Sequence, residues 1–348
     1  MKKYQAEQIR NLALVGHGGV GKTSLVETLL FKTGGSSRRG RVEDGNTVSD
    51  YDAEEIKRQI SISTSIVPCE WKNHKLNILD APGFFDFEGE VKEALRVAEL
   101  ALVLVSATAG VEVGTEKVWD YAEDLPKMIF VNKMDQENAD FSKVLASLKD
   151  KFGTSIVALQ LPLGQEADFS GVVDLITMKA YKYEGGKRTE VPVPAELEGD
   201  IETLREELME AVAVTDEDLL ERYLGGEDIA PEEIAKAVAV GTKQGDVIPV
   251  LCGSASTEVG CEELLDALVA YVPSPLDAGC KPDDPLAALV FKTTADPFVG
   301  KLTFFKVFSG TLRSDSHVYN TSQKADERIG QLFIQKGKEQ QPTSEIVA

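Results

Sequence analysis

Three short motifs along the chain carry residues that can bind a nucleotide. The first, Gly16–Thr23, matches the phosphate-binding loop pattern G-x-x-x-x-G-K-[ST] in full. Its glycines let backbone N–H groups converge on phosphate oxygens, while Lys22 is placed for the β- and γ-phosphates and the Thr23 hydroxyl for a magnesium ion. Alone, the loop indicates only a nucleoside triphosphate. The residues expected to contact it are His17, Gly18, Gly19, Val20, Gly21, Lys22, Thr23 and Ser24.

The second motif is Asp80-Ala81-Pro82-Gly83, a D-x-x-G pattern that follows an apolar run. An aspartate at the carboxyl end of a strand can hold a metal ion through water, and the Gly83 N–H can contact a γ-phosphate. A plain β-turn has the same pattern. The position after a phosphate-binding loop and an expected hairpin favours the functional interpretation.

The third motif is Asn132-Lys133-Met134-Asp135, an N-K-x-D pattern at the end of another apolar run. Asp135 can accept hydrogen bonds from the ring N–H and the exocyclic amine of guanine, a pair that adenine does not offer. Asn132 can bond the acceptor edge of the base, and the Lys133 stem can cover its face. A buried carboxylate disfavours any base that leaves it unpaired, so GTP and GDP are the expected ligands. A backbone N–H of Ser254–Ala255 is a weaker candidate for the guanine carbonyl.

The elements around these motifs alternate between apolar runs and helical patterns, which predicts a mostly parallel sheet flanked by helices. The phosphate-binding loop lies between a strand at 12–15 and a helix that stops at Gly34-Gly35. Between that helix and the second motif, the pattern predicts a long functional or mobile loop at 34–59, a strand starting at Ile60, and a turn over 68–75 before the strand 76–79. Further strands are expected at 100–105, 128–131, 156–161 and 247–251.

Breaks in this alternation divide the chain into regions. A GTP-binding domain is expected over 1–160 and 246–275, interrupted by an α+β insertion over 161–245 with a turn at 185–188 and three acidic helices. The acidic faces suit a solvated surface, or alternatively the docking of a partner protein. Residues 276–285 form a linker, and 286–348 alternate as short strands with a turn at Asp296-Pro297, which predicts an incomplete β-barrel.

Composition narrows the possible partners and location. The net charge of -21 argues against sequence-independent DNA binding through a broad basic face, although a local basic patch for RNA is compatible with it. Four dispersed cysteines without a C-x-x-C pair fit the reducing cytoplasm. The longest apolar run, 100–105, is too short to cross a membrane. We therefore expect a cytoplasmic protein with no membrane or DNA partner, and a monomer.

Taken together, the motifs resemble those of the translational GTPases, and elongation factor G most closely. The resemblance extends to 160–164 and 171–175, where the insertion of that family opens, and to 285–292, 296–302 and 309–312, which are similar to its second domain. It implies a GTPase that uses Mg²⁺ and acts on the ribosome through ribosomal RNA and proteins. It also implies three further domains, so we expect the chain to be a fragment of a longer protein.

Departures from the family pattern concern catalysis more than binding. The family's metal-binding threonine falls on Ser61, so the expected metal ligands are Thr23, Ser61 and Asp80; two residues earlier a glycine is replaced by Gln59. Gly19 replaces an aspartate of the loop. The histidine that orients the attacking water in the family is Phe84 here, as in elongation-factor-G-like paralogues.

Phenylalanine cannot hydrogen-bond water, so intrinsic hydrolysis should be slow, with Lys22 and Gly83 the remaining contributors to catalysis. Three functions therefore stay open. The first is a GTPase stimulated by the ribosome, and the second a GTP-gated ribosome-binding module that hydrolyses poorly. The third is a ribosomal protection or peptide-release GTPase, which the second-domain stretches disfavour.

Overall fold

A computed structural model describes residues 2, 4–296 and 300–348 of the chain. Its central sheet has seven strands in the order β2-β3-β1-β4-β5-β11-β6, and only β2 is antiparallel to its neighbour. The strands of this sheet are β1 (Ile9–Gly16), β2 (Ser65–Trp71), β3 (His74–Asp80), β4 (Leu100–Ser106), β5 (Lys127–Asn132), β6 (Ile156–Ala158) and β11 (Ile248–Cys252).

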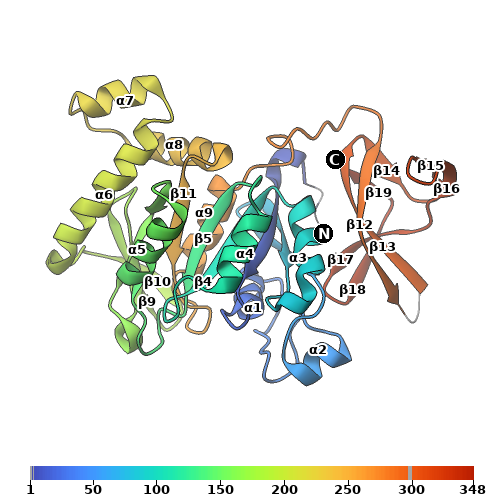
Figure 1. The fold of residues 1–348 in the computed structure, drawn as a ribbon, viewed down its shortest axis with the longest axis horizontal. Helices are drawn as coiled ribbons and strands as arrows, with labels where there is room; N and C mark the ends of the chain where they lie inside the picture. Colours follow the sequence, from blue (N-terminus) through green and yellow to red (C-terminus); the bar gives the residue numbers. More distant parts are fainter. Residues whose placement is uncertain (1, 3, 297–299) are drawn as a thin grey trace.

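Helices cover both faces of this sheet (Figure 1). Side chains alternate along β1, so Leu12 and Leu14 join one core with helices α1 and α9, while Ala13 and Val15 join the other with α3, α4 and α5. This burial on both faces is why the strands read as continuous apolar runs. The helices are α1 (Lys22–Lys32), α3 (Glu88–Val97), α4 (Val113–Tyr121), α5 (Phe141–Phe152) and α9 (Cys261–Tyr271), with a short α2 (Ala53–Arg58) outside the sheet.

Between β6 and β11 the chain forms a separate four-stranded antiparallel sheet in the order β10-β9-β8-β7, followed by three helices. Its elements are β7 (Gln160–Leu163), β8 (Gly171–Asp174), β9 (Lys179–Glu184), β10 (Lys187–Val191), α6 (Glu198–Ala213), α7 (Glu217–Leu224) and α8 (Pro231–Gln244). Tyr183 of β9 donates a hydrogen bond to Glu263 of α9 at 2.5 Å, and Arg188 of β10 lies 3.4 Å from the same carboxylate. A buried acid of the main domain thus fixes the insertion.

The C-terminal strands lie at the opposite end of the molecule from α6–α8 (Figure 1). They form four antiparallel pairs: β12 (Ala287–Asp296) with β13 (Gly300–Ser309), β14 (Thr311–Arg313) with β19 (Glu345–Val347), β15 (His317–Asn320) with β16 (Ala325–Arg328), and β17 (Leu332–Lys336) with β18 (Glu339–Thr343). The Gly337 N–H donates to the Ile66 carbonyl at 2.9 Å, so the β17–β18 turn is bonded to β2. The turn expected at Asp296-Pro297 falls partly on residues outside the described ones.

Three local expectations were wrong, each for a physical reason. The strand expected at Ile60 begins at Ser65, because the Ile62 and Ser63 N–H groups donate to the Glu55 carboxylate rather than to a strand. The turn expected over 68–75 is mostly strand, since Pro68 lies on the edge strand β2, where a missing N–H is tolerated. The single strand expected over 156–161 is divided between two sheets as β6 and β7.

A fourth expectation, the turn over 185–188, holds only for its two glycines. Gly185 and Gly186 have φ values of 59° and 78°, and Lys187 already belongs to β10. The pattern missed this strand because β10 carries polar, largely exposed side chains. No helix within the described part of the chain combines the length and the apolar character that a membrane span requires.

Replacing Tyr183 by Phe tests the bond between insertion and main domain. Glu263 is 5% exposed, and burial raises its pKa, so losing the phenol donor leaves a buried carboxylate with fewer partners. We expect the free energy of unfolding to fall by about 1–3 kcal/mol in urea denaturation. Tyr319→Phe, at a side chain that is 60% exposed, is the control and should change it by less than about 0.5 kcal/mol. Equal effects would contradict this role of Tyr183.

Candidate nucleotide site

The phosphate-binding loop connects β1 to α1 at the carboxyl edge of the central sheet, where open α/β folds bind ligands. Gly21 precedes α1 with φ 96°, and a Cβ there would lie 2.6 Å from the Asn132 side-chain nitrogen, so this position requires glycine. Lys22 Nζ donates to the carbonyls of Gly16 and His17, each at 3.0 Å, which holds the ammonium inside the loop. Burial lowers the pKa of Lys22 to about 8, opposed by the charges of Asp80 and Asp50.

The three expected metal ligands converge beside Lys22. Thr23 Oγ1 lies 3.1 Å from Ser61 Oγ although the residues are 38 positions apart. Asp80 is 1% exposed, and within the described part of the chain both of its carboxylate oxygens are buried without a hydrogen-bond partner. Two hydroxyls and an unpaired carboxylate are hard oxygen donors, so these residues fit Mg²⁺.

Asp50 is an acidic residue of this site that the sequence did not single out. It is 5% exposed, and burial followed by the charge of Asp80 raises its pKa to about 7. Burial likewise raises the pKa of Asp80 to about 6. Two buried acids near one another are stabilised by a cation. Asp50 lies in the long polar loop, where no spacing or periodicity distinguishes it from its neighbours.

The N-K-x-D motif at the end of β5 is bonded directly to the phosphate-binding loop. Asn132 Nδ2 donates to the Val20 carbonyl at 2.9 Å, and Lys133 Nζ donates to the Gly19 carbonyl at 2.7 Å. Asp135 Oδ1 is buried and has no hydrogen-bond partner within the described residues. An unpaired acceptor next to the loop is what a base offering two N–H donors would satisfy.

The Ser254–Ala255 segment lies against Asn132, but its N–H groups already have partners. Ala255 N–H donates to Asn132 Oδ1 at 3.0 Å, and Ser254 N–H donates to the Val259 carbonyl at 2.9 Å. The expected bond to a guanine carbonyl therefore requires the Ala255 N–H to share or exchange its acceptor.

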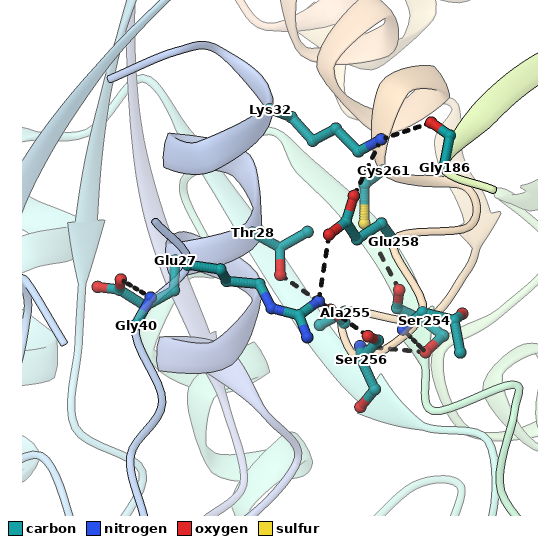
Figure 2. Close-up of polar contacts among 12 residues, drawn as sticks. Glu27, Thr28, Lys32, Gly40, Gly186, Ser254, Ala255, Ser256, Glu258 and Cys261 are labelled. Carbon is teal, nitrogen blue, oxygen red and sulfur yellow. Dashed lines mark hydrogen bonds and ion pairs between the residues drawn. The ribbon is translucent and has the colours of Figure 1, made fainter. Parts of the chain in front are cut away.

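Helix α1 and the long loop fix this segment from the other side (Figure 2). The Ala255 carbonyl accepts from Thr28 Oγ1 at 2.8 Å and from Arg39 at 3.1 Å, and Arg39 also donates to the Ser256 carbonyl at 2.8 Å. Glu27, next to Thr28, accepts from the Gly40 N–H at 3.0 Å. Arg39 was missed by sequence reasoning because it lies more than 200 residues from the carbonyls that it binds.

Gly83 and Phe84 lie against the phosphate-binding loop. A Cβ on Gly83 would lie 2.3 Å from Lys22 Nζ and 2.8 Å from the Gly18 Cα, so the D-x-x-G turn touches the phosphate-binding loop. The Phe84 ring packs over Gly18, since a Cβ built on Gly18 would lie 3.4 Å from atoms of that ring. Phe84 itself is 44% exposed. His17 turns away, with Nε2 3.5 Å from Glu112 and its ring 6.1 Å from that of Phe85. The position after Gly83 thus presents an aromatic ring that cannot hydrogen-bond water.

Comparisons with known proteins show the family to which the chain belongs. The family model of the elongation factor Tu GTP-binding domain matches residues 7–274, and that of elongation factor G domain 2 matches residues 285–348. The chain belongs to the elongation-factor family of GTP-binding proteins. A curated elongation factor G from Thermotoga maritima is 40% identical over 94% of this chain and 50% of its own length, and that from Thermotoga petrophila matches equally.

A solved structure from Thermus thermophilus shares the fold, with a TM-score of 0.90 and 38% identity over 98% of this chain and 51% of that one. The predicted fold class and family resemblance are thereby confirmed. The chain spans about half the length of the curated relatives that it matches.

Arg39→Ala tests whether the long loop supports the Ser254–Ala255 segment. Losing its bonds to the Ala255 and Ser256 carbonyls should loosen that segment and speed GDP release about fivefold, as expected for roughly 1 kcal/mol. Stopped-flow release of a fluorescent GDP measures this rate. Arg41→Ala removes a charge from the same loop, at a side chain that is 66% exposed, and should leave the rate unchanged. Equal rates for the two variants would show that Arg39 has no such role.

Proposed function

We propose that this chain is the GTP-binding head of an elongation-factor-G-like translational GTPase, acting on the ribosome as a cytoplasmic monomer. The observation that carries the proposal is the buried, unpaired Asp135 Oδ1 beside a motif whose Asn132 and Lys133 are bonded to the phosphate-binding loop. These bonds connect the segment proposed to recognise the base directly to the loop proposed to bind the phosphates. Family membership supports the same function.

The roles of the individual residues follow from their positions. Lys22 neutralises the phosphates, the loop N–H groups and the α1 N-terminus receive their oxygens, and Asp135 selects guanine. Thr23, Ser61 and Asp80 would hold Mg²⁺, with Asp50 near them, and the ion would supply positive charge for the phosphate oxygens. Ser24 and the loop residues His17 to Gly21 complete the contacts.

Nucleotide selectivity tests this proposal. GDP and GTP should bind at least about 1,000-fold more tightly than ADP and ATP, because adenine leaves the buried carboxylate unpaired. Asp135→Asn should remove most of this preference, since the amide cannot accept both guanine N–H bonds. Glu137→Gln, at an exposed side chain of the same loop, is the matched control. Equal affinity of the parent protein for guanine and adenine nucleotides would overturn the proposal.

A second function, a GTP-gated ribosome-binding module with weak hydrolysis, is favoured by one observation. The Phe84 ring occupies the position after Gly83 and packs over Gly18. The ring supplies no group that can hydrogen-bond and orient a water molecule, so binding can order the loops while hydrolysis lacks one of its usual contributors.

Phe84→His distinguishes the two functions. Single-turnover GTP hydrolysis should be slow in the parent and rise about 100-fold or more in this variant, the range typical of a positioned acid–base group. Phe85→His, at the neighbouring aromatic residue, should change little. The measurement is made with and without ribosomes. Rapid ribosome-stimulated turnover in the parent would contradict the gated-module function, and no turnover until histidine is restored would contradict the ribosome-stimulated enzyme.

A further inference from the structure

A buried lysine connects the C-terminal strands to the segment that carries Ser61. The side chain of Lys292, on β12, is 5% exposed. Its Nζ donates to the Thr64 carbonyl at 2.9 Å and to Glu90 Oε2 at 2.5 Å, and it also contacts the Ser63 hydroxyl. A buried ammonium is costly unless it is paired and hydrogen-bonded, so this arrangement is strongly specified.

Glu90, on α3, completes the arrangement from a second element. Its Oε2 accepts from the Thr64 N–H at 2.6 Å and from Ser63 Oγ at 3.2 Å, and its carbonyl accepts from Thr64 Oγ1 at 2.9 Å. The carboxylate therefore binds the segment and Lys292 together. Removing the lysine leaves a carboxylate next to this segment without its counter-ion.

Glu55, on the short helix α2, holds the segment from a third side. It is 2% exposed, and its Oε1 accepts from the N–H groups of Ile62 and Ser63 at 3.0 and 3.1 Å. Among the described residues, backbone 62–64 pairs with no strand, and side chains of α2, α3 and β12 hold it in place. Ser61 immediately precedes it, and its hydroxyl lies 3.1 Å from Thr23 Oγ1.

We propose that Lys292 is a positioning residue for the GTP-bound state: from the C-terminal strands it fixes Ser63 and Thr64, and thereby helps to place the Ser61 hydroxyl beside Thr23 for a Mg²⁺ ion. This inference rests on the proposed function of the site. Lys292 acts through Ser63, Thr64 and Glu90, and none of these three is a proposed Mg²⁺ ligand. Because coupling between sites is reciprocal, GTP binding tightens the docking of the C-terminal strands by the same factor.

The proposal predicts that a change at Lys292 weakens the binding of GTP selectively. Loops of this kind are ordered by the γ-phosphate with Mg²⁺ and released once that phosphate is lost, so the Ser61 position matters for GTP and little for GDP. Lys292→Met, which keeps length and packing, should raise the dissociation constant of a non-hydrolysable GTP analogue about tenfold, within the usual range of coupling between sites. The constant for GDP should change less than about twofold. Equilibrium titration with fluorescent nucleotides at saturating Mg²⁺ measures both.

Lys306 provides a matched control. It too is a largely buried lysine of the C-terminal strands that pairs with an acid of the main domain, Glu99, and it donates to the Val97 carbonyl at 2.9 Å. Val97 is the last residue of α3 and Glu99 follows it, whereas Glu90 lies in the first turn of this helix. Lys306→Met should leave the ratio of GTP to GDP affinity unchanged. An equal change of this ratio in both variants would mean general loosening of the interface and would overturn the proposal.

A double-mutant cycle with Ser61→Ala tests the route of the effect. If Lys292 acts through Ser61, adding Lys292→Met to Ser61→Ala should not lower the affinity ratio further, whereas additive effects would overturn the proposal. If the Lys292 variant does not fold, Glu90→Gln replaces it in both comparisons. A parent chain that binds neither nucleotide would refute the proposed function, while normal binding with an unchanged ratio in the Lys292 variant would refute this inference alone.

Discussion

Burial of charge at the carboxyl edge of the central sheet is the constraint on which the site depends. Lys22, Asp50 and Asp80 are all nearly inaccessible to water, and the two acids have pKa values raised by that burial. Burying such groups is costly without counter-charges, and a bound phosphate and a cation would supply them. The strands bring these residues together from distant parts of the chain. Gly18 and Gly83 let the D-x-x-G turn approach the phosphate-binding loop closely.

The rest of the fold fixes the loops around that cluster. Asn132 and Lys133 connect the base-reading motif to the phosphate-binding loop, and Thr28 and Arg39 bind the Ala255 carbonyl from the other side. The insertion is anchored through the buried Glu263, and the C-terminal strands through Lys292 and Lys306. The contacts of Glu263, Lys292 and Lys306 involve largely buried charged groups, and such charge-assisted bonds are more directional than apolar packing.

The same packing separates binding from catalysis. The residues proposed to bind GTP and Mg²⁺ lie at the carboxyl edge of the sheet, whereas the position after Gly83 carries a phenyl ring over Gly18. A site can therefore bind its nucleotide well and still lack a group for positioning water, because the two tasks use different atoms. This distinction makes Phe84 more informative about the role of the protein than the nucleotide-binding motifs are.

The sequence by itself determined the family, the α/β fold class and the residues of the three motifs, because each motif is local and its spacing follows from a loop at the end of a strand. It could not determine contacts between segments far apart in the chain. The positions of Arg39, Asp50 and Lys292 depend on buried polar partners in other elements, and no periodicity marks them. The late start of β2 has the same cause, since Glu55 takes the N–H groups that a strand would use. Tertiary structure decided these features because buried hydrogen-bond partners, rather than local propensity, set the lowest free energy there.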